Sequence, residues 1–273
     1  MKRTLSAVVL HGVLILGAIV TLVPLAWMVS ASVMPTGEAS AYPPSFLPSR
    51  VTFVHYRTLF SSLNLGRCLL NSAFIATTAT ALCLLFTSMA GYAFARLRFP
   101  SRDRIFRSLL AGMVIPAQVS MLPLFLLLKS LGLVNTYWGV LVPYLAPIFG
   151  IFMIRQYALS VPGELLDAAR VDGAGEFWVY WHVVLPLCRP ILVTLAVFMF
   201  MGTWNDFMWP LIELTDDRLY TLPVALANLV GEHAQDTELM MAGSVLTVLP
   251  VLVLFLAMQR HYIEGIMMGG VKE

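Results

Sequence analysis

Residues 160–186 read SVPGELLDAARVDGAGEFWVYWHVVLP, a polar stretch between two long apolar runs of the chain. Pro162 suits the first turn of a helix, and Gly173 can end that helix. A second short helix fits residues 175–184, and Pro186 would stop it because proline lacks the N–H that a helix interior needs. The stretch therefore predicts a helix, a glycine turn and a second helix lying at a membrane surface.

The rest of the chain is dominated by apolar runs. Of its 273 residues, 59% are apolar and 12% are charged, and the mean hydropathy is +0.83. A soluble domain has about 45–50% apolar and about 25% charged residues, so this composition excludes a cytosolic enzyme. Runs long enough to cross a bilayer lie at about 8–32, 68–93, 105–130, 137–158, 190–212 and 239–260. We therefore expect an all-α, polytopic membrane protein in which residues 1–273 form one domain of six transmembrane helices.

The placement of Lys and Arg predicts the orientation of the chain. If the six runs are spans, alternate connecting segments hold 12 and 5 of the 17 basic residues. The richer set includes both ends of the chain and the residues between the second and third runs. By the positive-inside rule, we expect both termini to be cytoplasmic and residues 160–187 to be a cytoplasmic segment.

The remaining charged and sulfur-bearing residues exclude some classes of function. The net charge of +2 is too small to indicate nucleic-acid binding. Cys68, Cys83 and Cys188 are widely separated and lack metal-ligand spacing, so we expect buried thiols without disulfides and no metal site. Acidic residues gather in the loop predicted outside, namely Glu213, Asp216, Asp217, Glu232, Asp236 and Glu238.

The first predicted helix of residues 160–187 has the composition of a docking surface. Four residues at helical spacing lie on or near one face: Leu165, Ala168, Ala169 and Asp172. An amphipathic helix that only rests on lipid headgroups is the alternative, and such a helix is usually basic. This helix holds Glu164, Asp167 and Asp172 against a single Arg170, so its charge favours a protein partner.

The same residues resemble a known family. Asp167-Ala168-Ala169, three residues, Gly173, nine residues and then Val183-Val184-Leu185-Pro186 resemble the EAA motif of ABC-importer permeases, E-A-A-x3-G-x9-I-x-L-P. Asp replaces the first Glu of the motif and Val replaces its Ile. Trp204-Asn205-Asp206 and Gly269-Gly270-Val271-Lys272 resemble the carbohydrate-importer branch, in particular the smaller maltose-type permease.

The resemblance implies a type I importer permease fold and a set of partners. These are a homologous second permease, two copies of a cytoplasmic ATPase subunit that binds the ATP and Mg²⁺, an extracytoplasmic solute-binding protein and a sugar-like substrate. It also implies the inner membrane of a prokaryote, and a coupling helix that docks on the ATPase. The residues that match or flank the motif are Glu164, Asp167, Ala168, Ala169, Asp172, Gly173, Leu185 and Pro186. The chain has no Walker A sequence, so we expect it to have no ATPase site and to bind no cofactor.

Polar residues inside the apolar runs are candidates for the translocation path. Polar groups are costly in lipid and therefore face a bundle interior, a partner or a water-filled path. The candidates are Asn71, Gln118, Trp204, Asn205 and Asp206. Three of them have alternative roles. Asn71 could form a hydrogen bond to a neighbouring helix, and Trp204 could anchor the chain at the membrane interface. Asp206 could form a structural bond to the partner permease.

Two other functions compete with an ATP-driven importer. An ion-coupled secondary transporter of a small polar solute would need ionisable residues deep in several spans, and Asp206 is the only clear one. An intramembrane enzyme would need a catalytic motif, and the chain has neither H-E-x-x-H nor G-x-S-x-G. We therefore predict a sugar-translocating importer subunit.

Overall fold

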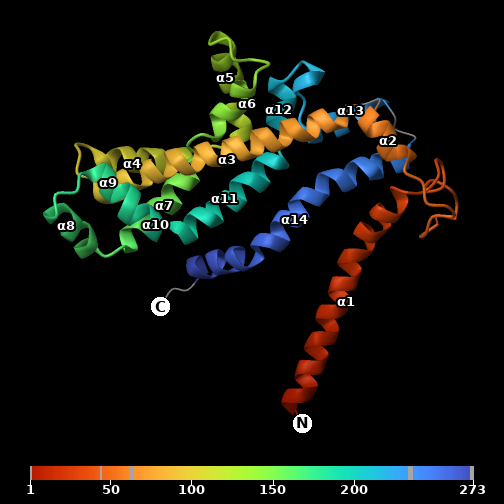
Figure 1. Ribbon diagram of the computed structural model, residues 1–273, viewed down its shortest axis with the longest axis horizontal. Helices are drawn as coiled ribbons and strands as arrows, with labels where there is room; N and C mark the ends of the chain where they lie inside the picture. The colour runs from red at the N-terminus through yellow and green to blue at the C-terminus, as the bar shows by residue number, and fades with distance from the viewer. Residues whose placement is uncertain (1, 44, 62–63, 233–235, 271–273) are drawn as a thin grey trace. The chain divides into compact units, whose positions relative to one another are not determined.

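The computed structural model describes residues 2–43, 45–61, 64–232 and 236–270, and its regular elements there are all helical (Figure 1). Within the described part, contacts divide the chain into two compact units. The first unit combines residues 1–67 with 222–250, and the second combines 68–221 with 251–273. Val271 and Lys272 of the C-terminal sequence motif lie outside the described residues.

The α-helices are α1 (Lys2–Ala31), α2 (Val54–Ser61), α3 (Leu65–Arg96), α4 (Arg102–Gly112), α5 (Ala117–Ser130), α6 (Tyr137–Leu141), α7 (Ile148–Ser160), α8 (Gly163–Val171), α9 (Glu176–Val179), α10 (Leu185–Leu187), α11 (Arg189–Trp204), α12 (Met208–Glu213), α13 (Leu222–Glu232) and α14 (Thr237–Gly270). Two 3₁₀ turns, Val142–Tyr144 and Asp217–Leu219, and a π-helical turn, Tyr180–Val184, complete the set.

The six predicted spans correspond to helices, but only half of them are continuous. Within the described residues, three helices are long and apolar enough to cross a membrane: Val9–Ala31, Leu65–Arg96 and Thr237–Gln259. Three bent helix pairs pass the same test as units: Arg102–Gly112 with Ala117–Ser130 (106°), Tyr137–Tyr144 with Ile148–Ser160 (41°), and Glu176–Leu187 with Arg189–Trp204 (77°). The last pair begins before the predicted span 190–212 and includes residues predicted to lie at the membrane surface. The chain therefore has up to six spans, in agreement with the predicted number, and three of them are bent.

Proline explains the break in the predicted span 105–130. The helices α4 and α5 meet at 106°, and Pro116 precedes α5 with an extended ψ of 135°. Proline has no backbone N–H to donate in a hydrogen bond, and it disfavours helical φ and ψ angles in the residue before it. Pro147 starts α7 in the same extended conformation, which accounts for the 41° bend in the predicted span 137–158.

The predicted span 190–212 is interrupted for a different reason. The helix α11 ends at Trp204, and a new helix, α12, begins at Met208. The Asp206 carboxylate accepts a hydrogen bond from the backbone N–H of Trp209 at 3.4 Å, as a capping residue does at the start of a helix. Capping by Asp206 favours a new helix start over the continuation of α11.

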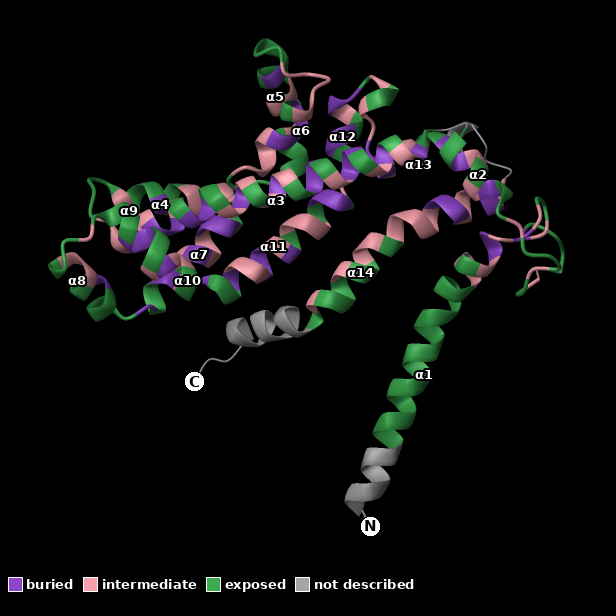
Figure 2. Cartoon of the chain, in the orientation of Figure 1, coloured by how far each residue is buried: buried purple, intermediate pink, exposed green. Residues whose placement is uncertain are grey.

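The long helix α3 organises the second unit. One core cluster joins its C-terminal half to α7, α8, α9 and α11, and includes Tyr92, Ile154, Leu166 and Leu195. Another cluster joins its N-terminal half to α5, α6 and α12 around Trp209. Figure 2 shows buried residues along α3 and α11, in contrast to α1, whose described residues 9–26 are exposed throughout. A chain with this much exposed apolar surface is built to contact lipid or other subunits.

In the first unit, the loop after α1 is attached to the start of α14. The buried Glu238 carboxylate accepts a hydrogen bond from the backbone N–H of Ala39 at 2.7 Å. The hydroxyls of Ser40 and Thr237 are 2.8 Å apart, and the buried His55 contacts the Met34 carbonyl at 2.9 Å. The helices α2 and α13 in these loops were not predicted by the apolar-run analysis, which detects only long segments.

Candidate functional site

The helix α8 is a surface helix held by one buried side chain. Leu166 is 1% exposed and belongs to the core cluster of the second unit, whereas Leu165 is 47% and Val171 88% exposed. Glu164, Asp167, Ala168 and Asp172 are also exposed. The structure therefore leaves most of the predicted docking residues open to a partner.

Ala169 departs from the expected position. It is half-buried and packs against the core cluster, whereas Ala168 is exposed. Residues i and i+1 point about 100° apart on a helix, so one alanine can face the core while the next faces solvent. The expectation that both alanines lie on the open face is therefore corrected, and Ala168 is the small residue that a partner can approach.

Gly173 ends α8 in the predicted way. Its φ is +87°, a left-handed conformation that favours glycine. Its backbone N–H donates to the Arg170 carbonyl at 3.0 Å, and the N–H of Ala174 donates to the Ala169 carbonyl at 2.9 Å. These two bonds form a Schellman motif, which satisfies carbonyls that the end of a helix otherwise leaves without donors.

A charged network fastens α8 to α9 and α3. Arg170 donates to Glu176 from Nε at 2.8 Å and from Nη2 at 3.3 Å, and to Asp167 from Nη1 at 2.9 Å. The Tyr92 hydroxyl of α3 donates to Oε2 of Glu176 at 2.6 Å. The bond to Glu176 raises the pKa of Arg170 above its ordinary value, so the guanidinium stays charged. Asp167 thus already has an ion-pair partner within the chain.

Arg96 holds the chain where it leaves α7. Its guanidinium donates to the carbonyls of Ala158 at 2.7 and 3.0 Å, of Leu159 at 3.1 Å and of Val161. A cation at the C-terminal end of a helix satisfies free carbonyls and is favoured by the helix dipole. Sequence reasoning assigned Arg96 and Tyr92 no role, because their partners lie more than 60 residues away.

The second helix of the segment also differs from the prediction. The helix does not stop at Pro186, since residues 180–184 form a π-helical turn and α10 continues to Leu187. The N–H of Leu185 donates to the Tyr180 carbonyl, an i→i+5 bond of the kind that defines a π-helical turn. The turn lies directly before Pro186, which has no backbone N–H to donate. The sharp break follows at Cys188. Leu185 packs partly against the core and Pro186 is exposed.

The buried Asn71 is hydrogen-bonded within the chain. Its Nδ2 donates to the carbonyls of Arg218 and Tyr220, both at 3.0 Å, and its Oδ1 accepts from the Tyr137 hydroxyl at 2.8 Å. Both amide hydrogens are occupied, and the residue is 5% exposed. The alternative of a structural hydrogen bond is thus present, and the assignment of Asn71 to the translocation path stays a prediction.

Asp206 and Trp204 are also engaged within the chain. Asp206 accepts a hydrogen bond from the Tyr144 hydroxyl in addition to the Trp209 N–H. Trp204 is 2% exposed and stacks on Phe200 with ring centroids 5.8 Å apart. Asp206 therefore has structural bonds within this chain, and its place in the translocation path stays a prediction.

Gln118 and Asn205 remain open. Gln118 lies in the first turn of α5 and is exposed, and Asn205 is exposed at the end of α11. Asn205 donates from Nδ2 to the Met201 carbonyl at 2.8 Å, which leaves its Oδ1 for another contact. Of the five predicted path residues, these two have polar groups that a ligand can reach.

The cysteines behave as predicted. Cys83 and Cys188 are free thiols, and these two and Cys68 are buried. Across residues 2–43, 45–61, 64–232 and 236–270, no three His, Cys, Asp or Glu residues are grouped as metal ligands would be.

Comparison with known proteins places the chain in a family. The family model for the inner membrane component of binding-protein-dependent transport systems matches residues 85–266. The arabinooligosaccharide transport permease of Halalkalibacterium halodurans is 37% identical, with all of both chains covered. The lactose transport permease of Rhizobium radiobacter is 33% identical, covering 100% of this chain and 98% of the other. The diacetylchitobiose uptake permease of Streptomyces coelicolor is also 33% identical, covering 96% and 88%.

A solved structure has the same fold. A chain of a bacterial ABC transporter involved in the import of the polysaccharide alginate superimposes with a TM-score of 0.85 at 23% identity, covering 96% of this chain and 98% of that one. Bent and interrupted spans are therefore compatible with the fold of an importer permease. From the family match and the full-length relatives together, the chain belongs to the inner membrane components of binding-protein-dependent transport systems.

Proposed function

We propose that the chain is a permease subunit of an ATP-binding cassette importer that translocates an oligosaccharide or a sugar derivative. The relatives support this class, since their names give arabinooligosaccharides, lactose and diacetylchitobiose as cargo. A permease of Brucella abortus that is 29% identical is named for sn-glycerol-3-phosphate. Because these cargoes share hydroxyl groups and differ in size and charge, the proposal names a class of substrate and not one sugar.

The proposed assembly has four kinds of subunit. This chain pairs with a homologous permease, two copies of a cytoplasmic ATPase bind ATP and Mg²⁺, and an extracytoplasmic protein delivers the substrate. An alginate importer has been solved in complex with its alginate-bound periplasmic protein, which supports the last partner. This chain contributes no ATPase site and holds no cofactor. Both of its termini, and α8, face the cytoplasm.

The observation that carries the coupling role is the contrast between the two sides of α8. Leu166 and Ala169 hold the helix to the core, while Glu164, Leu165 and Ala168 are exposed. A short, anchored helix with an exposed small residue can fit into a cleft of another protein and transmit force in both directions. We therefore propose that Ala168 and its exposed neighbours contact the ATPase, and that Ala169 and Leu185 position the segment.

Cysteine cross-linking tests this contact directly. The native thiols are buried, so a single new cysteine in the wild-type chain can be labelled selectively. Ala168→Cys should cross-link to the ATPase subunit in the assembled importer, and the exposed Thr215→Cys should not. If the Ala168→Cys chain cross-links only to lipid or to nothing while the complex stays assembled, the docking assignment is wrong.

Transport measurements test the function itself. In proteoliposomes with the partner subunits, we expect uptake that requires ATP and the loaded binding protein and that persists after a protonophore dissipates the proton gradient. Ala168→Glu should lower this uptake by about tenfold or more, because it buries an unpaired carboxylate in the interface. Thr215→Glu is the control. Uptake that follows an ion gradient and ignores ATP would instead favour the ion-coupled secondary transporter.

Gln118 and Asn205 are the proposed substrate contacts of this chain. Both are exposed and carry polar groups that can bind sugar hydroxyls. Gln118→Ala and Asn205→Ala should raise the substrate concentration needed for half-maximal uptake without loss of assembly. The variant Asn71→Ala should act differently, lowering the amount of folded chain instead.

A further inference from the structure

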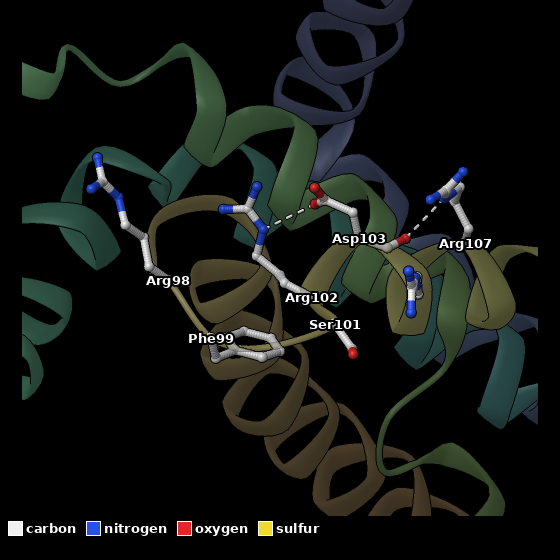
Figure 3. A pocket seen from close by; sticks show the side chains of 7 residues that line it. Arg98, Phe99, Ser101, Arg102, Asp103 and Arg107 are labelled. Carbon is white, nitrogen blue, oxygen red and sulfur yellow. Dashed lines mark hydrogen bonds and ion pairs between the residues drawn. The ribbon is translucent and has the colours of Figure 1, made fainter.

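Arginines line an open pocket at the loop between α3 and α4. Its volume is about 650 Å³, and Figure 3 shows the side chains around it. The lining residues are Arg98, Phe99, Ser101, Arg102, Asp103, Arg104 and Arg107. Four of the seven are arginines, and one is acidic. The pocket therefore has the character of an anion site, and the proposed coupling role does not use it.

Most of the positive charge in this pocket is uncompensated. Asp103 pairs with Arg102 at 3.0 Å, and Arg107 donates only to the Asp103 backbone carbonyl at 3.2 Å (Figure 3). The exposed side chains of Arg98 and Arg104 make no hydrogen bond or ion pair within the described residues. The pocket thus has one carboxylate for four guanidinium groups, each of which can bind a phosphate in a bidentate manner.

The surroundings of the pocket combine this charge with apolar surface. Phe99 and Ile105 are exposed and are neighbours of the arginines in the sequence, and the pocket lies at the junction of α3 and α4, both of which belong to segments long and apolar enough to cross a membrane. Ser101 precedes α4 with a φ of +62°, and its side chain makes no cap hydrogen bond. The start of α4 thus lacks a side-chain cap, and the positive end of its helix dipole adds to the attraction for an anion.

We propose that this arginine pocket binds the phosphate headgroup of an anionic phospholipid. A phosphodiester supplies the charge that the four arginines lack, and its acyl chains can lie over Phe99 and Ile105. Basic pockets between membrane helices are known to bind such headgroups. A free phosphate ion has the same charge chemistry but would leave the adjacent apolar surface uncovered, so we commit to the lipid.

The bound headgroup would lie next to the coupling segment. A neighbouring cavity of about 480 Å³ shares Arg98 and Arg102 with the first pocket and is also lined by Asp167, Arg170 and Glu176. A phosphate on Arg98 and Arg102 weakens the attraction of these arginines for the carboxylates across the cavity. The lipid composition of the membrane therefore acts on the charges that border α8.

Calorimetric titration of the assembled importer in neutral detergent tests the proposal. The probes are dioctanoyl phosphatidylglycerol, dioctanoyl phosphatidylcholine and inorganic phosphate. We expect saturable binding of phosphatidylglycerol that weakens with salt, and little binding of the other two. The double variant Arg98→Gln/Arg104→Gln should bind phosphatidylglycerol about 30-fold more weakly, since each basic residue at an anionic surface contributes about fivefold.

Two variants separate charge from fold. Arg50→Gln/Arg57→Gln removes two exposed arginines from the first unit and should bind like the wild type. Arg98→Lys/Arg104→Lys keeps the charge and should bind more tightly than the glutamine pair, which shows that the site stays folded. Equal affinity for phosphatidylcholine, an undiminished affinity in the glutamine pair, or equal affinity for inorganic phosphate would overturn the proposal. So would loss of the ATPase subunit from the glutamine pair with lipid binding intact, because the arginines would then dock a protein.

Discussion

Gly91 lies where α3 crosses α7, and an alanine there should separate the two helices. An added Cβ would lie 2.6 Å from Cγ2 and 2.7 Å from Cβ of Ile154, and 3.0 Å from the backbone nitrogen of Arg155. Real Cβ atoms are almost never found closer than 3.0 Å to another heavy atom. A rotamer change of Ile154 can move Cγ2, but Cβ and the Arg155 nitrogen are fixed to the backbone of α7, so it cannot fully relieve the clash.

The expected cost follows from two opposing terms. Overpacking a well-packed core costs about 1–3 kcal/mol. Replacing glycine by alanine inside a helix recovers up to about 1 kcal/mol of helix propensity. Ile154 is 1% exposed, which leaves little room for the neighbouring side chains to shift. We therefore expect a net loss of about 1–2 kcal/mol in the stability of the second unit.

A matched substitution gives the control. Gly202 lies in α11, and no heavy atom lies within 4 Å of the position that an added Cβ would take, so Gly202→Ala should be neutral or slightly stabilising. The melting temperature of each detergent-solubilised variant can be measured by fluorescence size-exclusion chromatography after heating. A change of 1 kcal/mol in stability should shift it by about 2–4 °C. Ile154→Ala removes the clashing Cγ2 but leaves Cβ and opens a cavity, so it should not restore the wild-type melting temperature to Gly91→Ala. If Gly91→Ala melts at the same temperature as the wild type, the crossing is looser than described.

Three further predictions address the candidate site. Gly173→Ala should cost about 1 kcal/mol through its left-handed φ and lower the binding-protein-stimulated ATPase rate, and Gly173→Asn should cost less. Asn71→Ala should lower the melting temperature by an amount equivalent to about 2–4 kcal/mol, because it leaves two carbonyls and the Tyr137 hydroxyl without partners. Asp206→Asn and Tyr144→Phe should be non-additive in a double-mutant cycle of melting temperature, and additive effects would show that the two residues act independently.

The positions of the spans could be predicted from the sequence, but their continuity could not. A bilayer requires about 20 apolar residues per crossing, and this requirement leaves a signal in any single sequence. The breaks come from single residues that disfavour a continuous helix. Pro116 and Pro147 lack the backbone N–H that a helix needs, and the Asp206 carboxylate accepts a hydrogen bond from the N–H of Trp209 near the start of α12. Each of these residues also occurs within unbroken helices of other proteins, and here Pro123 lies inside α5 without ending it.

The acidic loop shows a second limit of sequence reasoning. Glu213 and Glu238 count as loop charges in a composition argument, yet both are 0% exposed. Glu238 is buried because it accepts the backbone N–H of Ala39, almost 200 residues earlier in the chain. A partner at such a distance leaves no pattern in the local sequence, and the same holds for Asn71 and the turn around Tyr220 that it binds.

In the segment 160–187, the turn at Gly173 could be predicted from the sequence, but the contacts that hold the segment to the rest of the chain could not. The Schellman ending at Gly173 follows from the local sequence, whereas the attachment of the segment also uses residues of α3 that are more than 60 positions away and bind the chain on either side of α8. Leu166 enters the core, Tyr92 reaches Glu176, and Arg96 holds the end of α7. Arg170 of α8 binds the same Glu176 carboxylate that Tyr92 of α3 binds, so a chain of hydrogen bonds connects α8 to α3. The helix α3 is long and apolar enough to cross a membrane. Through these contacts, the ATPase contact that we propose at Ala168 would act on a membrane-spanning helix.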